Sequence, residues 1–134
     1  MSRWCVGTFL AVLLLSLTAT AKGDDEPTYQ GRPLHEWVKL LKKGDGAARQ
    51  RAALAIGEMG PKAKAAVPDL VDALKDKSGR VRRFAAKALG QIGPKAKAAV
   101  PSLTEALKDD EVGSMAGYAL KKIDPEAARK AGVK

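Results

Sequence analysis

Apolar residues recur along this chain at the spacing of one face of an α-helix. The first such face lies in residues 34–41, where positions i, i+3, i+4 and i+7 are Leu34, Trp37, Val38 and Leu41. Similar faces follow at Leu70, Val71 and Leu74, at Leu103 and Leu107, and along residues 79–92. In residues 79–92 the apolar side opposes a polar stripe of Arg80, Arg83, Lys87 and Gln91. No segment alternates as a strand does, so the pattern predicts an all-α domain.

These helices belong to a repeat. Residues 57–76 and 90–109 are identical at 15 of 20 positions, with an offset of 33 residues. Such a period is typical of solenoids, in which each unit buries its apolar face against the next. Extended in both directions, the register predicts about three antiparallel helix pairs. We place the units at about residues 33–60, 61–93 and 94–124, with a C-terminal cap at 125–134.

Residues that start and end helices agree with this division. Asp45, Ser78 and Asp109 or Asp110 precede the second helix of each unit, where a side-chain oxygen can accept from free backbone N–H groups. Glycines are expected to be bend residues at the helix ends: Gly57, Gly60, Gly90 and Gly93. The segment KAKAAV then forms a helical turn or bent lead-in, and Pro68 and Pro101 occupy the first position of the next helix.

Three units are about the minimum for a stable stack, so its ends need cover. We expect Trp37 to close the N-terminal end and the tail IDPEAARKAGV to cover the last unit.

The N-terminal segment has the organisation of a secretory signal. Arg3 precedes the uncharged stretch WCVGTFLAVLLLSLTATA, which ends in the small residues Ala19-Thr20-Ala21. We expect cleavage after Ala21, a flexible linker at residues 22–32, and export to the periplasm or the extracellular space. The alternative is a retained membrane anchor. After cleavage no membrane span and no cysteine remain, because the only cysteine is Cys5.

The repeated residues resemble a known family. Read from Asp45 to Asp109, the pattern DxxxRxxAAxALGxIGPxAxxAVPxLxxALKD is similar to the HEAT repeat, and most similar to the short bacterial phycobilisome-lyase-type HEAT-like repeat. The resemblance covers about residues 33–124 and implies a right-handed α-solenoid that acts as a scaffold or binding surface. It also implies that Arg49 and Arg82 bridge neighbouring units to acidic residues. The third unit departs from the pattern, with Gly113 in the arginine position.

Catalytic chemistry has few candidates in this sequence. His35 is the only histidine, and a metal site needs several converging ligands. The hydroxyl side chains lack a nearby histidine base, and no glycine-rich phosphate loop is present. The carboxylates of Asp109, Asp110 and Glu111 are interpreted as stabilising a helix start. We therefore predict no catalytic residue, no metal and no cofactor.

The surface is the remaining source of function. The chain has a net charge of +9, or +8 after loss of Arg3 (23 basic and 15 acidic residues). In a helical solenoid one helix of each pair lines the concave side, which is the usual binding side, and by analogy we place the second helices there. There we predict partner-binding residues Arg80, Arg83, Lys87, Gln91, Tyr118 and Lys122. A basic edge is predicted at Lys62, Lys64, Lys95 and Lys97.

These residues support two functions. The first is a non-catalytic scaffold that binds a protein partner, and the alternative is binding of a polyanion such as nucleic acid or an acidic glycan. A subunit of an enzyme complex related to HEAT-like lyases is a distant third. The repeat pattern sets no oligomeric state.

Overall fold

The computed structural model describes residues 25–134, so the expected signal segment at residues 1–21 lies outside the described part. The described chain is a row of helices preceded by a short hairpin. The hairpin strands are β1 (Thr28–Tyr29) and β2 (Arg32–Pro33), and the α-helices are α2 (Leu34–Lys43), α3 (Gly46–Met59), α4 (Val67–Ala73), α5 (Gly79–Ile92), α6 (Val100–Ala106), α7 (Gly113–Ile123) and α8 (Pro125–Lys130). Two 3₁₀ segments precede α4 and α6: η1 (Gly60–Ala66) and η2 (Gly93–Ala99).

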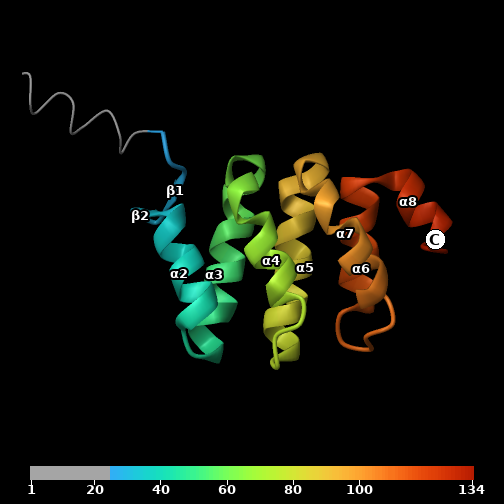
Figure 1. Cartoon of the computed structure of the whole chain (residues 1–134), viewed down its shortest axis with the longest axis horizontal. Coiled ribbons are helices and arrows are strands. Elements are labelled where there is room, and N and C mark those ends of the chain that lie inside the picture. Colours follow the sequence, from blue (N-terminus) through green and yellow to red (C-terminus); the bar gives the residue numbers. More distant parts are fainter. Residues whose placement is uncertain (1–24) are drawn as a thin grey trace, which may run out of the picture.

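The helices form antiparallel pairs that lie side by side, as Figure 1 shows. The pairs are α2 with α3, α4 with α5, and α6 with α7, and α8 follows at the end of the row. The expected all-α solenoid is therefore confirmed. The second helices of the pairs pack directly against each other, α3 on α5 and α5 on α7, and these are the most extensive helix contacts in the stack.

The helix boundaries follow the expected start and stop residues in the first two pairs. The Asp45 carboxylate accepts a hydrogen bond from the Ala48 N–H at 2.8 Å, and the Ser78 hydroxyl accepts from the Val81 N–H at 3.5 Å. The third pair differs from the expectation. Helix α7 begins at Gly113 without a side-chain cap, and the Asp109 carboxylate instead accepts from the Glu111 N–H at 2.9 Å in the preceding turn.

Only two of the four glycines expected at helix ends are bends. Gly60 and Gly93 have φ angles of 63° and 76°, which side chains with a Cβ rarely adopt. Gly57 and Gly90 are instead helical residues at which neighbouring helices approach closely. A Cβ on Gly90 would lie 3.1 Å from the Ala119 Cα. These glycines let α3, α5 and α7 stack tightly, and the segments after Gly60 and Gly93 form the expected bent lead-ins η1 and η2.

Aliphatic side chains and alanine fill the layer between the units. Ile56, Leu70, Leu89, Ile92, Leu103 and Leu120 are the largest fully buried aliphatic residues. In residues 25–134 no polar or charged residue is buried as a whole, and the one buried polar side-chain atom without a hydrogen-bond partner is the Gln91 Oε1. Burial of these apolar surfaces is the main force that holds the thin stack together.

Both ends of the described stack are covered. At the N-terminal end, the Trp37 indole is buried and its Nε1 donates to the Tyr29 carbonyl oxygen at 3.2 Å. The expected flexible linker at residues 22–32 is ordered from residue 28 onward, because Gln30 and Gly31 turn the chain into a hairpin with φ angles of 51° and 73°. At the other end, Ala128 of α8 is buried.

Candidate interaction surface

Two arginines join neighbouring units through paired carboxylates. Arg49 of α3 donates from Nε and Nη2 to the Asp76 carboxylate, at 2.7 and 3.1 Å. Arg82 of α5 stands one repeat further along and donates from Nε to the Asp109 carboxylate at 2.9 Å. Each arginine thus ties its second helix to the turn that precedes the next second helix. Gly113, at the third arginine position, has no side chain to continue the series.

These contacts shift the ionisation of their carboxyl groups. Burial raises the pKa of Asp76, but hydrogen bonds from Arg49 and the Ser78 N–H lower it more, so the net shift is downward. The Glu111 N–H and then Arg82 lower the pKa of Asp109. The hydrogen bond to Asp76 raises the pKa of Arg49. Asp76 and Asp109 are therefore carboxylates at neutral pH, where they pair with Arg49 and Arg82.

The remaining cations of α5 surround a hollow of 330 Å³ on the second helices. We call it the α5 hollow, and its lining residues are Gln50, Arg80, Arg83, Phe84, Lys87 and Met115. Gln50 comes from α3 and Met115 from α7, so the hollow spans the second helices of all three pairs. Its lining combines three cations with two partly buried apolar side chains and has no carboxylate.

The cations of the α5 hollow differ from Arg82 although they share its helix. Arg82 is in an ion pair, whereas in residues 25–134 no carboxylate lies within 4.0 Å of the charged groups of Arg80, Arg83 or Lys87. Arg80 and Arg83 are exposed, and Lys87 is half-buried. The helix thus carries one cation that joins neighbouring units and three that line a hollow.

The other predicted partner-binding residues lie elsewhere on the second helices. Gln91 packs on Gly57, and its Nε2 donates to the Glu58 carboxylate at 3.5 Å. Tyr118 is 43% exposed and packs against Gly90, and the Lys122 Nζ lies 5.7 Å from its ring centroid. Tyr118 lines a separate hollow of 570 Å³ beside the C-terminal tail. The structure therefore brings Arg80, Arg83 and Lys87 together and does not bring Tyr118 into their hollow.

Sequence reasoning missed the floor of the α5 hollow. Phe84 belongs to the apolar side of its helix in the periodic pattern, and Met115 is part of no predicted site. Both are half-buried and reach the hollow from α5 and α7. The repeat contained a signal for this pairing, because Met115 aligns with Phe84 at the 31-residue offset of the last unit.

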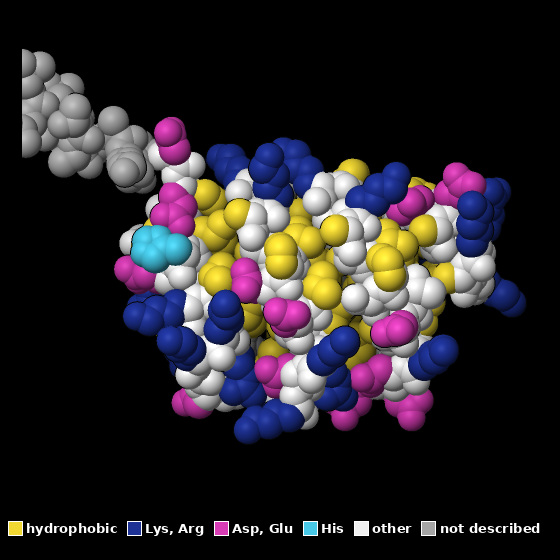
Figure 2. Space-filling view, viewed as in Figure 1, with side chains coloured by type: hydrophobic (Ala, Val, Ile, Leu, Met, Phe, Trp, Pro, Cys, Tyr) yellow, Lys and Arg dark blue, Asp and Glu magenta, His cyan; other side chains and the backbone are white. Residues whose placement is uncertain are grey.

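The predicted basic edge lies on the 3₁₀ segments. Lys62 and Lys64 belong to η1, Lys95 and Lys97 belong to η2, and all four are exposed. The two segments contact each other, so these lysines share one edge of the stack. Figure 2 shows Lys and Arg side chains in dark blue along the upper edge, where Figure 1 places η1 and η2.

The only histidine, His35, contacts a carboxylate at the start of α2. The Glu26 carboxylate accepts from the His35 backbone N–H at 2.7 Å and lies 2.8 Å from the His35 Nδ1. The hydrogen bonds from the His35 side chain and backbone lower the pKa of Glu26. Within residues 25–134 no group of three or more His, Cys, Asp or Glu residues is placed to hold a metal ion.

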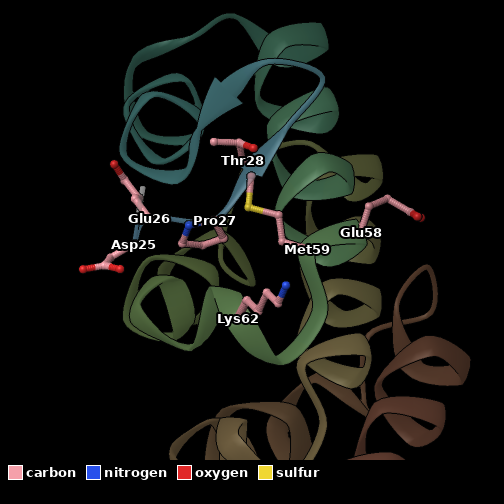
Figure 3. A pocket seen from close by; sticks show the side chains of 7 residues that line it. All are labelled: Asp25, Glu26, Pro27, Thr28, Glu58, Met59 and Lys62. Atoms are coloured by element: carbon pink, nitrogen blue, oxygen red, sulfur yellow. The ribbon is translucent and has the colours of Figure 1, made fainter. Parts of the chain in front are cut away.

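A third hollow, of 770 Å³, lies between the start of the described chain and the end of α3 (Figure 3). Figure 3 shows carboxylates and one amine around it, and the lining residues are Asp25, Glu26, Pro27, Thr28, Glu58, Met59 and Lys62. Because its lining begins at the first described residue, we assign no site to it.

The helices of residues 25–134 include none with the length and apolar character that a membrane span requires.

Comparison with known proteins identifies the repeat. A family model described as HEAT repeats matches residues 34–121, which is 88 of the 134 residues. A search of curated proteins found no match.

Proposed function

Because the chain belongs to the HEAT repeat family, we propose that it is a non-catalytic, exported module that binds a protein partner on its second helices. Helical repeat proteins commonly serve as scaffolds that bind partners along an extended surface. The observation that carries the proposal is the α5 hollow, which is built from all three second helices and lined by apolar side chains and by cations that have no ion pair within residues 25–134. A concave lining of this kind can receive a segment of another protein.

The arrangement of the helices supports this choice of surface. The second helices contact each other more extensively than the first helices do, as expected for the inner row of a curved stack. They also expose Tyr118, the one exposed large hydrophobic residue in the described part. Tyrosine and arginine are common at the energetic centres of protein interfaces.

Site-specific photocrosslinking tests the proposal. A photoreactive amino acid at Lys87, in the α5 hollow, should capture a discrete protein in the organism that makes this chain, and excess unlabelled protein should compete with the capture. The matched control replaces Lys39, an exposed lysine of the first helix α2. Equal capture from both positions would show that the second helices are not the binding side, and capture from neither would count against a protein partner.

The basic edge supports a second candidate function, the binding of a polyanion such as nucleic acid or an acidic glycan. Its four exposed lysines lie on adjacent segments and are part of the excess of basic residues that gives the chain its net charge of +9. Binding to nucleic acid through these lysines should weaken steeply between about 50 and about 200 mM salt, because counterions are released. An affinity for a nucleic acid probe that is constant over this range would eliminate this candidate.

Export is proposed from the sequence of residues 1–21. Mass spectrometry of the protein from its native source should find a mature chain that begins at Lys22. An intact N-terminus at Met1 on the same material would contradict cleavage and favour the retained anchor.

A further inference from the structure

We propose that the α5 hollow binds an acidic segment of a partner protein, with an apolar side chain of that segment seated between Phe84 and Met115. This inference rests on the proposed function and specifies the chemistry of the partner. It is carried by the composition of the hollow, in which Arg80, Arg83 and Lys87 surround a floor of half-buried apolar side chains.

Charge complementarity identifies the sign of the occupant. Three cations within two turns of one helix repel each other, and like charges at such spacings destabilise a helix by about 0.2–0.5 kcal/mol per pair. On the same helix Arg82 is matched to Asp109, whereas no acid lines the hollow. An anionic occupant relieves this repulsion, and the two guanidinium groups can each hold a carboxylate in a two-pronged hydrogen bond.

The apolar floor favours a protein segment over a nucleic acid. Phe84 belongs to α5 and Met115 to α7, so the floor bridges two units. Methionine adapts its shape to a bound apolar group, and an aromatic ring next to it provides a rigid wall. The hollow of 330 Å³ has room for a few side chains and holds three cations. Three cations are few beside the about 6–10 phosphate contacts of a strongly salt-dependent nucleic acid binder.

The helix that carries the three cations is also held in place by contacts at its N-terminal end. Arg82 donates a hydrogen bond to the Asp109 carboxylate, and the Ser78 hydroxyl accepts one from the Val81 N–H. The Gln50 amide of α3 adds one neutral hydrogen-bonding group to the lining. Side chains carried on rigid helices bind with a smaller entropic cost than side chains on loops.

A peptide array tests the proposal with the purified protein. The array holds extended peptides of one length that vary independently in acidic and in apolar content. We expect binding only from peptides that have both, and replacing either Glu by Gln or the apolar residue by Ser should weaken it. The double variant Arg80→Glu with Arg83→Glu should lower the affinity for the best peptide at least about tenfold, which is about 1.4 kcal/mol.

The matched control reverses two charges on the basic edge, Lys95→Glu with Lys97→Glu, and so has the same net charge as the α5 variant. Its affinity for the best peptide should equal that of the unaltered protein. A circular dichroism melt of both variants checks that each remains folded. An equal loss from both variants would mean that overall charge, and not the α5 hollow, determines binding.

Other outcomes would refute the acidic segment, and they can be told apart from a failure of the proposed protein binding. Binding of neutral apolar peptides as strong as that of acidic ones would refute the acidic occupant, while photocrosslinking at Lys87 could still show a protein partner. Tighter binding to a single-stranded oligonucleotide or to heparin than to any peptide would refute the protein segment and indicate that the hollow binds a polyanion. Absence of peptide binding at every composition would also refute the proposal.

Discussion

Arg82 contacts the turn between the helices of its own pair and the equivalent turn of the next pair: its Nη1 donates to the Asp76 carbonyl oxygen at 2.8 Å, and its Nε donates to the Asp109 carboxylate. The Asp76 carboxylate in turn holds Arg49. Two ion pairs are thereby linked through the backbone of one residue, and the link runs along the stack from the first unit to the third.

Replacing Arg82 by Ala should lower the melting temperature by several degrees, because the Asp76 carbonyl and the Asp109 carboxylate lose their partner together. Differential scanning calorimetry gives the measurement. Arg83→Ala is the control, since Arg83 is adjacent, exposed and in no ion pair within the described residues. If both variants melt together, the Arg82 contacts do not contribute to stability.

Acid should destabilise the fold through Asp76. Its folded pKa lies below the unfolded value of about 3.9, so its contribution is complete above that value and is lost as the pH falls through the folded pKa. Melting temperatures from pH 6 down to pH 2 should fall less steeply for Asp76→Asn than for the unaltered protein. Asp110→Asn, at an exposed neighbour of Asp109, should follow the unaltered curve. Parallel curves for all three proteins would rule out this source of acid sensitivity.

Gly90→Leu should reduce the free energy of unfolding by about 1–3 kcal/mol, because a side chain there forces α5 and α7 apart. The expected clash involves Ala119 and Tyr118, which lie 3.1 and 3.2 Å from the position of a Cβ. Urea denaturation measures the change. Gly46→Leu is the control, since a Cβ at Gly46 has no atom within 4 Å. Equal stabilities of the two variants would contradict the close approach at Gly90.

Trp37→Ala should cost about 3–5 kcal/mol, because it removes the largest apolar side chain at the N-terminal end and its contact with the hairpin. Tyr118→Ala removes an aromatic ring that is 43% exposed and should cost clearly less. The same denaturation experiment compares the two. A loss at Trp37 no greater than that at Tyr118 would show that the indole does not close the stack.

The repeat made most of the fold predictable from the sequence. The offset of 33 residues predicted the helix pairs, and Gly60 and Gly93 predicted where the second helices end. The hairpin at residues 28–33 was missed because two-residue strands are too short to show an alternating pattern. The Gln30-Gly31 pair was its only local signal, since a turn with two positive φ angles favours glycine.

The composition of the α5 hollow was less predictable than its charges. Arg80, Arg83 and Lys87 share a helix face, so their spacing placed them together. The positions of Met115 and Tyr118 depend on how α7 is rotated against α5, which periodicity does not define. Gly90 determines that packing by receiving the Tyr118 ring, and its role was hidden because a helical glycine resembles a helix-ending one in sequence.

Gly57 and Gly90 offer equivalent gaps to their neighbours, yet different side chains enter them, Gln91 at the first and Tyr118 at the second. The segments around these glycines are nearly identical, so during folding each could recruit the helix that belongs to the other. The narrow Gln91 amide fills the space at Gly57, and the wider Tyr118 ring fills the space at Gly90. The different shapes of these two side chains would favour the native pairing of helices, although the segments around the two glycines are nearly identical in sequence.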